Sequence, residues 1–236
     1  MATEFDTELQ DREAAGPSFA NLRRRMVEDQ LRGHGITDLR VLEAMGRVPR
    51  EEFVPPDLRS LAYQDGPLPI GFGQTISQPF TVAYMCQLLE PRGGEKVLEI
   101  GTGSGYSAAV LSHLAGEVFT VERIPGLAEL ARDHLLAYPN VHVATANGTV
   151  GLPEQAPFDG IVVTAGAPAL PDEYVKELRE GGRIVIPLGI DRFSQTMCRF
   201  TRLAGEMKVE ELGGFLFVPL IGKVGWSESD RAQHRW

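Results

Sequence analysis

Three alternating glycines, Gly101, Gly103 and Gly105, form the segment best suited to holding a ligand. They follow an apolar run at 96–100 and precede a predicted helix, and open α/β sheets bind ligands at such strand-to-helix turns. Glycine permits a tight turn and, because it has no Cβ, lets a ligand come close to the strand end and the helix N-terminus. The pattern predicts a ligand-binding loop; a tight turn without a ligand is the alternative interpretation.

The spacing of these glycines indicates the class of ligand. A dinucleotide fingerprint, G-x-G-x-x-G, would need its third glycine one residue later, where the bulky Tyr106 stands, and the G-K-[ST] of a phosphate-binding P-loop is absent. The arrangement is instead Glu99-x-Gly-x-Gly-x-Gly, with the acid inside the strand end. It is typical of S-adenosylmethionine-dependent methyltransferases, whose cofactor carries a cationic sulfonium and no phosphate.

Glu122 ends the next apolar run and is a second candidate for binding this cofactor. In nucleotide sites of the same topology, an acid at this place forms bidentate hydrogen bonds with ribose hydroxyls. A solvent-exposed Glu122 beside Arg123 is the alternative.

Short apolar runs alternate with helical patterns and predict the sheet that must position these residues. The runs lie at 96–100, 118–121, 141–144, 161–163 and 183–186, and the helices at 79–89, 106–115, 127–138 and 172–179. This alternation predicts an α/β fold with a doubly wound, mostly parallel sheet. Two further runs, 197–203 and 207–212, predict an antiparallel C-terminal hairpin at the edge of the sheet.

Two amphipathic helices are predicted before the sheet. The first follows the N-cap residue Ser18 and ends with Gly33 in the C′ position, and the second runs from Asp38 to the Val48-Pro49 pair. The next segment, 65–79, is rich in glycine, proline and hydrogen-bonding side chains. It is too long for a plain connection, and we expect a functional loop there.

The chain is predicted to form one domain with short additions at its ends. Residues 1–17 would be a flexible extension, 18–225 the methyltransferase domain and 226–236 a tail. Within the domain, the expected parts are N-terminal helices and a substrate loop at 18–79, a cofactor-binding core at 80–190 and C-terminal strands at 191–225.

Composition narrows the range of partners. The 236 residues include 23 Lys or Arg and 32 Asp or Glu, and the net charge of −9 disfavours nucleic acid. The 2 cysteines and 5 histidines match no metal-ligand spacing, so no metal is expected, and so few cysteines suit a reducing compartment. No apolar run is long enough for a signal or membrane segment. We expect a cytoplasmic monomer without nucleic-acid or membrane partners.

Motifs in separate parts of the chain carry a resemblance to one known family. They are PLPIG and GQTISQP within 67–79, VLEIGTGSGY at 97–106, VERI at 121–124, APFDGIVVTA at 156–165 and FVPL at 217–220. Together they resemble the protein-L-isoaspartate O-methyltransferase family, and the likeness extends over residues 26–222. The Thr75-Ile76-Ser77 block is more diagnostic than the glycine loop, which many methyltransferases share.

This resemblance implies a Rossmann-like methyltransferase fold and a repair reaction. The family transfers a methyl group from S-adenosylmethionine to the free carboxylate of an isoaspartyl residue, which arises by Asn deamidation or Asp isomerisation. The expected partners are therefore isoaspartyl proteins and peptides. Because the carboxylate is already ionised at neutral pH, the reaction needs no general base. Alignment of the reactants and exclusion of water are then the expected sources of catalysis.

The resemblance also implies roles for individual residues. Ser77 and, to a lesser degree, Thr75 are expected to orient the carboxylate, while Ile76, Ser77 and Val218 bind the substrate. Ser77 as a simple cap of the next helix is the alternative. The residues expected to bind the cofactor are Ile76, Gln78, Glu99, Gly101, Thr102, Gly103, Ser104, Gly105, Glu122, Arg123, Asn147, Gly148 and Thr164.

One departure from the family pattern concerns the adenine. Ala146-Asn147-Gly148 stands where the family usually has Gly-Asp-Gly. The family Asp is expected to accept a hydrogen bond from the adenine amino group. Asn147 can still accept one through its amide oxygen, but without the charge that strengthens such a bond.

Three other functions remain open at this point. The first is an aspartyl O-methyltransferase that acts on a peptide natural product. The second is a nucleic-acid methyltransferase, which is disfavoured because 164–168 reads TAGAP and lacks an Asn/Asp-Pro-Pro-aromatic motif. The third is a catalytically inactive protein that keeps the pocket as a sensor.

Overall fold

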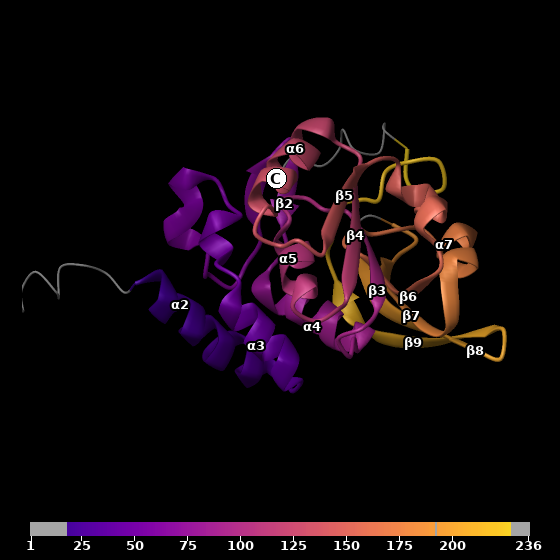
Figure 1. Cartoon of the computed structure of the whole chain (residues 1–236), viewed down its shortest axis with the longest axis horizontal. Helices are drawn as coiled ribbons and strands as arrows, with labels where there is room; N and C mark the ends of the chain where they lie inside the picture. Colours follow the sequence, from indigo (N-terminus) through magenta and orange to yellow (C-terminus); the bar gives the residue numbers. More distant parts are fainter. Residues whose placement is uncertain (1–17, 192, 228–236) are drawn as a thin grey trace, which may run out of the picture.

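The computed structural model describes residues 18–191 and 193–227. The predicted extension, 1–17, and residues 228–236 of the predicted tail lie outside these ranges. A central sheet with helices on both sides makes up the described part (Figure 1). The middle strands form where the sequence is apolar on both faces of the strand, as at Val97, Leu98 and Ile161, because helices shield both sides of the sheet there.

The sheet has seven strands in the order β5-β4-β3-β6-β7-β8-β9. Five of them are parallel, while β8 is antiparallel to β7, and β9 to β8. This confirms the predicted α/β fold and its antiparallel C-terminal hairpin. The strands are β3 (Lys96–Ile100), β4 (Glu117–Glu122), β5 (Val141–Thr145), β6 (Phe158–Val163), β7 (Leu178–Leu188), β8 (Gln195–Leu203) and β9 (Glu206–Phe215). The chain runs outward from β3 to β5 and then returns to β6 beside β3, so the topological switch point lies between β3 and β6.

Alternate residues of the strands enter two apolar clusters, one on each face of the sheet. Val97 and Val185 belong to the cluster beneath α4, α5 and α6, whereas Leu98 and Ile184 belong to the cluster beneath α7. In Figure 1, α3, α4 and α5 lie on one side of the sheet and α7 on the other. These helices are α4 (Pro79–Leu89), α5 (Tyr106–Ser112), α6 (Pro125–His134) and α7 (Asp172–Glu177).

The N-terminal helices form an outer layer against α4 and α5. Helix α2 (Phe19–Arg25), capped by Ser18, continues into a π-helical segment (Met26–Leu31) and a 3-10 turn (Arg32–His34). The left-handed residue that ends this helical run is Gly35, with φ 99°, so the prediction of Gly33 was wrong. The π and 3-10 segments carry the helical path past Gly33. Helix α3 (Leu39–Arg47) is capped by Asp38 and ends before Val48-Pro49, as predicted.

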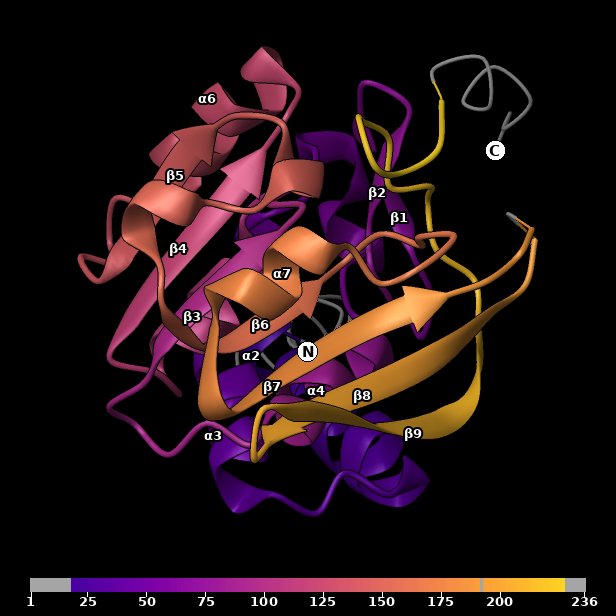
Figure 2. The ribbon, with the colours of Figure 1, turned by 90° about the vertical axis from the view of Figure 1, so that its right-hand side faces the viewer.

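The segment 65–79, predicted as a loop, contains a two-stranded hairpin. Its strands are β1 (Leu68–Gly71) and β2 (Gln74–Ile76), which pair in antiparallel fashion. The turn residues Phe72 and Gly73 both have positive φ, 53° and 67°, as a tight two-residue hairpin turn requires. Figure 2 shows this hairpin beside the C-terminal segment that follows β9.

Several predicted boundaries differ from those observed. Helix α7 ends at Glu177 rather than at 179, because Leu178 is already extended and pairs with Phe158 of β6. Short 3-10 turns that the sequence pattern did not indicate lie at Arg50–Glu52, Pro56–Leu61, Gly148–Val150 and Pro153–Gln155. Among the described helices, none is long and apolar enough to cross a membrane.

Candidate functional site

A cavity of about 390 Å³ opens at the carboxyl ends of β3, β4 and β6, the position expected for a ligand in this topology. The hairpin β1–β2 and the segment after β9 form its other walls. Most of the residues predicted for the site line this one cavity. They are Thr75, Ile76, Ser77, Gly101, Thr102, Gly103, Ser104, Glu122, Arg123, Gly148, Thr164 and Val218.

Gln78, Glu99, Gly105 and Asn147 were also predicted to bind the cofactor, but they do not line the cavity. Gln78 donates a hydrogen bond from Nε2 to Asp65 Oδ1 (2.7 Å) at the surface. Gly105 has φ 93° and is the N-cap residue of α5. Glu99 and Asn147 lie just behind the lining residues.

The glycine loop is held against the neighbouring strands by main-chain hydrogen bonds. Gly101 N–H donates to the Val121 carbonyl (2.9 Å), and Thr164 N–H donates to the Ile100 carbonyl (2.9 Å). Gly101 has φ 99°, and a Cβ there would lie 2.4 Å from Thr164 Oγ1. Only glycine fits at this position, which leaves the loop free to border the cavity closely.

Glu122 is held in place at the end of β4. Its Oε2 accepts a hydrogen bond from Gly103 N–H (3.0 Å) and its Oε1 accepts one from Ile124 N–H (2.9 Å). The side chain is only 6% exposed, so the exposed alternative is wrong. Because each carboxylate oxygen can accept a further hydrogen bond, this geometry fits a ligand with adjacent hydroxyls, such as a ribose.

Glu99 lies beneath the glycine loop and is completely buried. Its Oε2 accepts a hydrogen bond from Thr120 Oγ1 (2.6 Å), and Thr120 Oγ1 also lies 2.7 Å from Thr102 Oγ1. Oε1 has no hydrogen-bond partner within the described part of the chain. Burial raises the pKa of Glu99 to about 7, against the lowering effect of hydrogen bonds from Ser107 and Thr120. Glu99 thus supports the loop from below.

Ser77 lies between β2 and α4 and lines the cavity. The N-cap residue of α4 is Gln78, and no side chain caps this helix, so the helix-cap alternative for Ser77 is wrong. The Ser77 carbonyl accepts a hydrogen bond from Arg50 Nη2 (2.8 Å). The glycine loop shares its cavity with Ser77, Ile76 and Val218.

Asn147 caps the 3-10 turn Gly148–Val150. Its Oδ1 accepts hydrogen bonds from Thr149 N–H (3.1 Å) and Thr149 Oγ1 (2.8 Å), while Gly148 lines the cavity. The amide oxygen predicted to accept from an adenine is thus already used twice. An acceptor role of Asn147 toward adenine stays a prediction.

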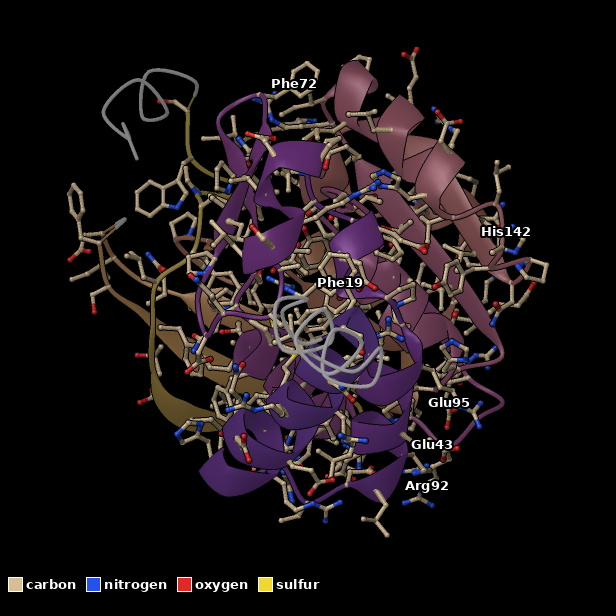
Figure 3. All side chains as sticks on the ribbon, turned by 90° about the vertical axis from the view of Figure 1, so that its left-hand side faces the viewer. Phe19, Glu43, Phe72, Arg92, Glu95 and His142 are labelled. Carbon is tan, nitrogen blue, oxygen red and sulfur yellow. The ribbon has the colours of Figure 1, made fainter. Side chains whose placement is uncertain are left out.

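The hairpin rests on the elements that surround the glycine loop. A Cβ on Gly103 would lie 3.3 Å from Ile70 Cδ1, and a Cβ on Gly126 would lie 2.5 Å from Phe72 Cζ. The Phe72 ring therefore packs directly on the first turn of α6 (Figure 3). The glycine at 126 is what admits the ring.

Sequence reasoning missed part of the lining. Some of the missed residues lie within the motifs themselves: Gly73, Gln74, Ile100, Tyr106, Val121, Ile124, Ala165, Pro219 and Leu220. Val82 of α4, Ser107 of α5 and Ile221 after β9 lie outside the motifs. The residues inside the motifs could have been found from their neighbours in the same motif. The C-terminal residues reach the cavity because Leu220 N–H donates to the Gly166 carbonyl (2.8 Å), a pairing that local sequence does not indicate.

Comparison with known proteins is decisive at this point. The family model described as protein-L-isoaspartate(D-aspartate) O-methyltransferase matches residues 22–225. The chain belongs to this family. The protein-L-isoaspartate O-methyltransferase 2 of Marinobacter nauticus is 54% identical over 214 residues, which cover 89% of this chain and 98% of that protein.

Solved structures give the same family and fold. A protein-L-isoaspartate O-methyltransferase structure has a TM-score of 0.77 and 30% identity, covering 86% of this chain and 67% of that one. A Plasmodium falciparum protein described as a putative member, in complex with S-adenosyl-L-homocysteine, has a TM-score of 0.72 and 24% identity, covering 83% and 96%. As a protein-L-isoaspartate O-methyltransferase, the chain is an S-adenosylmethionine-dependent protein carboxyl methyltransferase.

Proposed function

We propose that this protein methylates the free carboxylate of isoaspartyl residues in damaged proteins and peptides, with Ser77 as the residue that orients the acceptor. The observation that carries the proposal is that Ser77 and Val218 share one cavity with the glycine loop and Glu122. An acceptor held at Ser77 and a methyl donor held at the loop would therefore meet within a single enclosed space.

The cavity residues fit S-adenosylmethionine on grounds of their own chemistry. The Glu122 carboxylate, fixed by two N–H groups, suits the ribose, and apolar Ile100 and Val121 beside Gly148 suit a flat ring. When bound, this cofactor supplies the methyl group on a cationic sulfur. What the protein supplies is position and the exclusion of water.

The acceptor carboxylate needs no base, because it is ionised at neutral pH. Its negative charge disappears as the ester forms, so a strongly held carboxylate would react slowly. A neutral hydroxyl such as that of Ser77, with Thr75 beside it, can orient the anion without holding it too tightly. Ile76 and Val218 would pack against the acceptor's main chain.

The test is methyl transfer to paired peptides. The purified protein is incubated with S-adenosylmethionine and an isoaspartyl peptide or the same peptide with ordinary aspartate, and the methanol released from the ester is measured. Methanol from the isoaspartyl peptide alone supports the proposal. Equal transfer to the aspartate peptide would favour an ordinary aspartyl methyltransferase, an alternative that no observation supports. Binding of the cofactor without methyl transfer would indicate a sensor.

The setting of the activity is also proposed. Both cysteines, Cys86 and Cys198, are buried and free, which suits the reducing conditions of the cytoplasm. We propose a cytoplasmic monomer that acts on isoaspartyl polypeptides rather than on nucleic acid or membranes. Light scattering on the eluted protein measures the mass, and a species of twice 25.8 kDa would overturn the monomer.

A further inference from the structure

Arg50 is the largest of the fully buried side chains. It begins the 3-10 turn Arg50–Glu52, and its Nε donates to the Ala62 carbonyl (2.7 Å) while Nη2 donates to the Ser77 carbonyl (2.8 Å). Its Nη1 has no hydrogen-bond partner among the described residues. The guanidinium thus sits in the interior with part of its hydrogen-bonding capacity unused.

No carboxylate balances this cation. None of the ion pairs among residues 18–191 and 193–227 includes Arg50. The neighbouring Glu51 is engaged with Arg23 and Tyr63 instead. A buried cation without a counter-ion is costly, and a group of this kind calls for an explanation. The Tyr106 ring, whose centroid lies 4.8 Å from the guanidinium carbon, offsets part of the cost.

The position of Arg50 relates it to the acceptor side of the cavity. Ser77 and Tyr106 both line the cavity, and Arg50 lies directly behind them without lining it. Its hydrogen bond to the Ser77 carbonyl fixes the turn between β2 and α4. Because protein rather than water separates the guanidinium from the cavity, its field there is weakly screened.

We propose that Arg50 is a positioning residue for the methyl acceptor: its hydrogen bond fixes Ser77, and its unbalanced charge attracts the acceptor carboxylate from behind the cavity wall. The inference rests on the proposed function, since it needs an anionic acceptor at Ser77. The attraction acts on the ground state, because the acceptor loses its charge as the ester forms. Loss of the charge therefore raises KM without lowering kcat, and loss of the hydrogen bond that fixes Ser77 accounts for a smaller fall in kcat.

The test compares Arg50→Met, which removes the charge, with Arg50→Lys, which keeps it. Arg23→Met is the matched control, because Arg23 is also largely buried, with its side chain 18% exposed, but is paired with Glu51. For Arg50→Met we expect KM for an isoaspartyl peptide to rise by about tenfold or more, with a smaller change in kcat. Arg50→Lys should bring KM most of the way back to the value of the unaltered protein. Arg23→Met should change KM by less than about twofold.

A neutral ligand separates charge from structural damage. In the probe peptide the acceptor carboxylate is replaced by a carboxamide, and its inhibition constant is measured alongside the KM of the isoaspartyl peptide. Arg50→Met should weaken binding of the carboxylate peptide and leave binding of the carboxamide peptide almost unchanged. If binding of both peptides is weakened equally, or if the KM of the isoaspartyl peptide is unchanged, the proposal is overturned. Affinity for S-adenosylhomocysteine should stay within about twofold in every variant, since Arg50 does not reach the glycine loop.

Two further outcomes are informative. If Arg50→Met does not fold, Arg50→Lys decides: the preference for carboxylate over carboxamide should persist, and its collapse despite the retained charge would refute the charge role. If the unaltered protein methylates no isoaspartyl peptide, the proposed function fails. If the unaltered protein is active but Arg50→Met leaves the KM unchanged, this inference is refuted while the proposed function stands.

Discussion

The end of the cavity proposed to bind the cofactor differs from the end proposed to bind the acceptor in the charged residue beside it. Glu122, 6% exposed, lines the cavity beside the glycine loop, whereas a fully buried arginine, Arg50, lies behind Ser77. Glu99, fully buried beneath the loop, keeps its proton up to about pH 7 and therefore adds no full negative charge. The methyl donor is cationic and the proposed acceptor is anionic. Each reactant would therefore bind on the side with the opposite buried charge, so the cavity distinguishes the two before any side chain touches a reacting atom.

The largest expected effect concerns Glu99, whose pKa is raised to about 7 by burial. Between the pKa of the unfolded chain and about pH 7, unfolded Glu99 loses its proton while folded Glu99 keeps it, so the free energy of unfolding falls as pH rises through this window. Glu99→Gln removes this loss. We expect the variant to be more stable than the unaltered protein by up to about 3 kcal/mol at pH 8, and the gain to vanish below about pH 5.

Urea unfolding at pH 5 and pH 8 measures this difference. The exposed Glu117, at the other end of β4, provides the control, and Glu117→Gln should show no such gain. A gain of the same size at both pH values would contradict the raised pKa and indicate an effect on packing.

The next prediction tests the other acid on the cofactor side. Glu122→Gln loses the charge and one of the two acceptors that would face the ribose, so we expect affinity for S-adenosylhomocysteine to fall by about a hundredfold. Calorimetry measures the affinity, and Glu117→Gln again serves as the control. If Glu122→Gln raises the KM for the isoaspartyl peptide by the same factor, the two sides of the cavity do not act separately.

On the acceptor side, Ser77→Ala should lower kcat on an isoaspartyl peptide by more than about tenfold, because the carboxylate loses the donor that orients it. Affinity for S-adenosylhomocysteine should hardly change. Thr75→Val is the companion variant, with a smaller expected loss. Near-normal turnover of Ser77→Ala would remove this hydroxyl from the mechanism.

The smallest expected effect is at Asn147. In Asn147→Asp one oxygen can keep the hydrogen bonds to Thr149, and the other replaces the amide nitrogen as a charged acceptor for the adenine amino group. We expect affinity for S-adenosylhomocysteine to rise by about threefold to tenfold. The inosine analogue, which lacks the amino group, is the matched ligand. A gain for both ligands alike would refute contact with that amino group.

The glycine loop and the parallel strands could be predicted because each depends on local sequence, whereas the Thr75-Ile76-Ser77 block stands out only through the resemblance to the family. Gly101 must be glycine where the chain turns against Thr164, and the burial of both faces of β3 follows from apolar residues on both faces. Glu122 could be predicted in the same way, because it ends the apolar run that forms β4.

What could not be predicted depends on contacts between distant segments. The choice of Gly35 over Gly33 follows from the π-helical path of Met26–Leu31, which no pattern indicates. The hairpin β1–β2 is fixed by Phe72 on Gly126, and Arg50 becomes significant only once its guanidinium lies under Ser77. A lone arginine in a sequence gives no sign that it will be buried without a partner.

The contact between Phe72 and Gly126 has a consequence for the shape of the cavity. The hairpin covers the cavity, and its tip bears on the same helix that follows Glu122. A side chain at position 126 would occupy the space of the Phe72 ring and push the hairpin tip away from the helix. One aromatic contact outside the reacting centre thus sets how closely that wall of the cavity approaches the glycine loop.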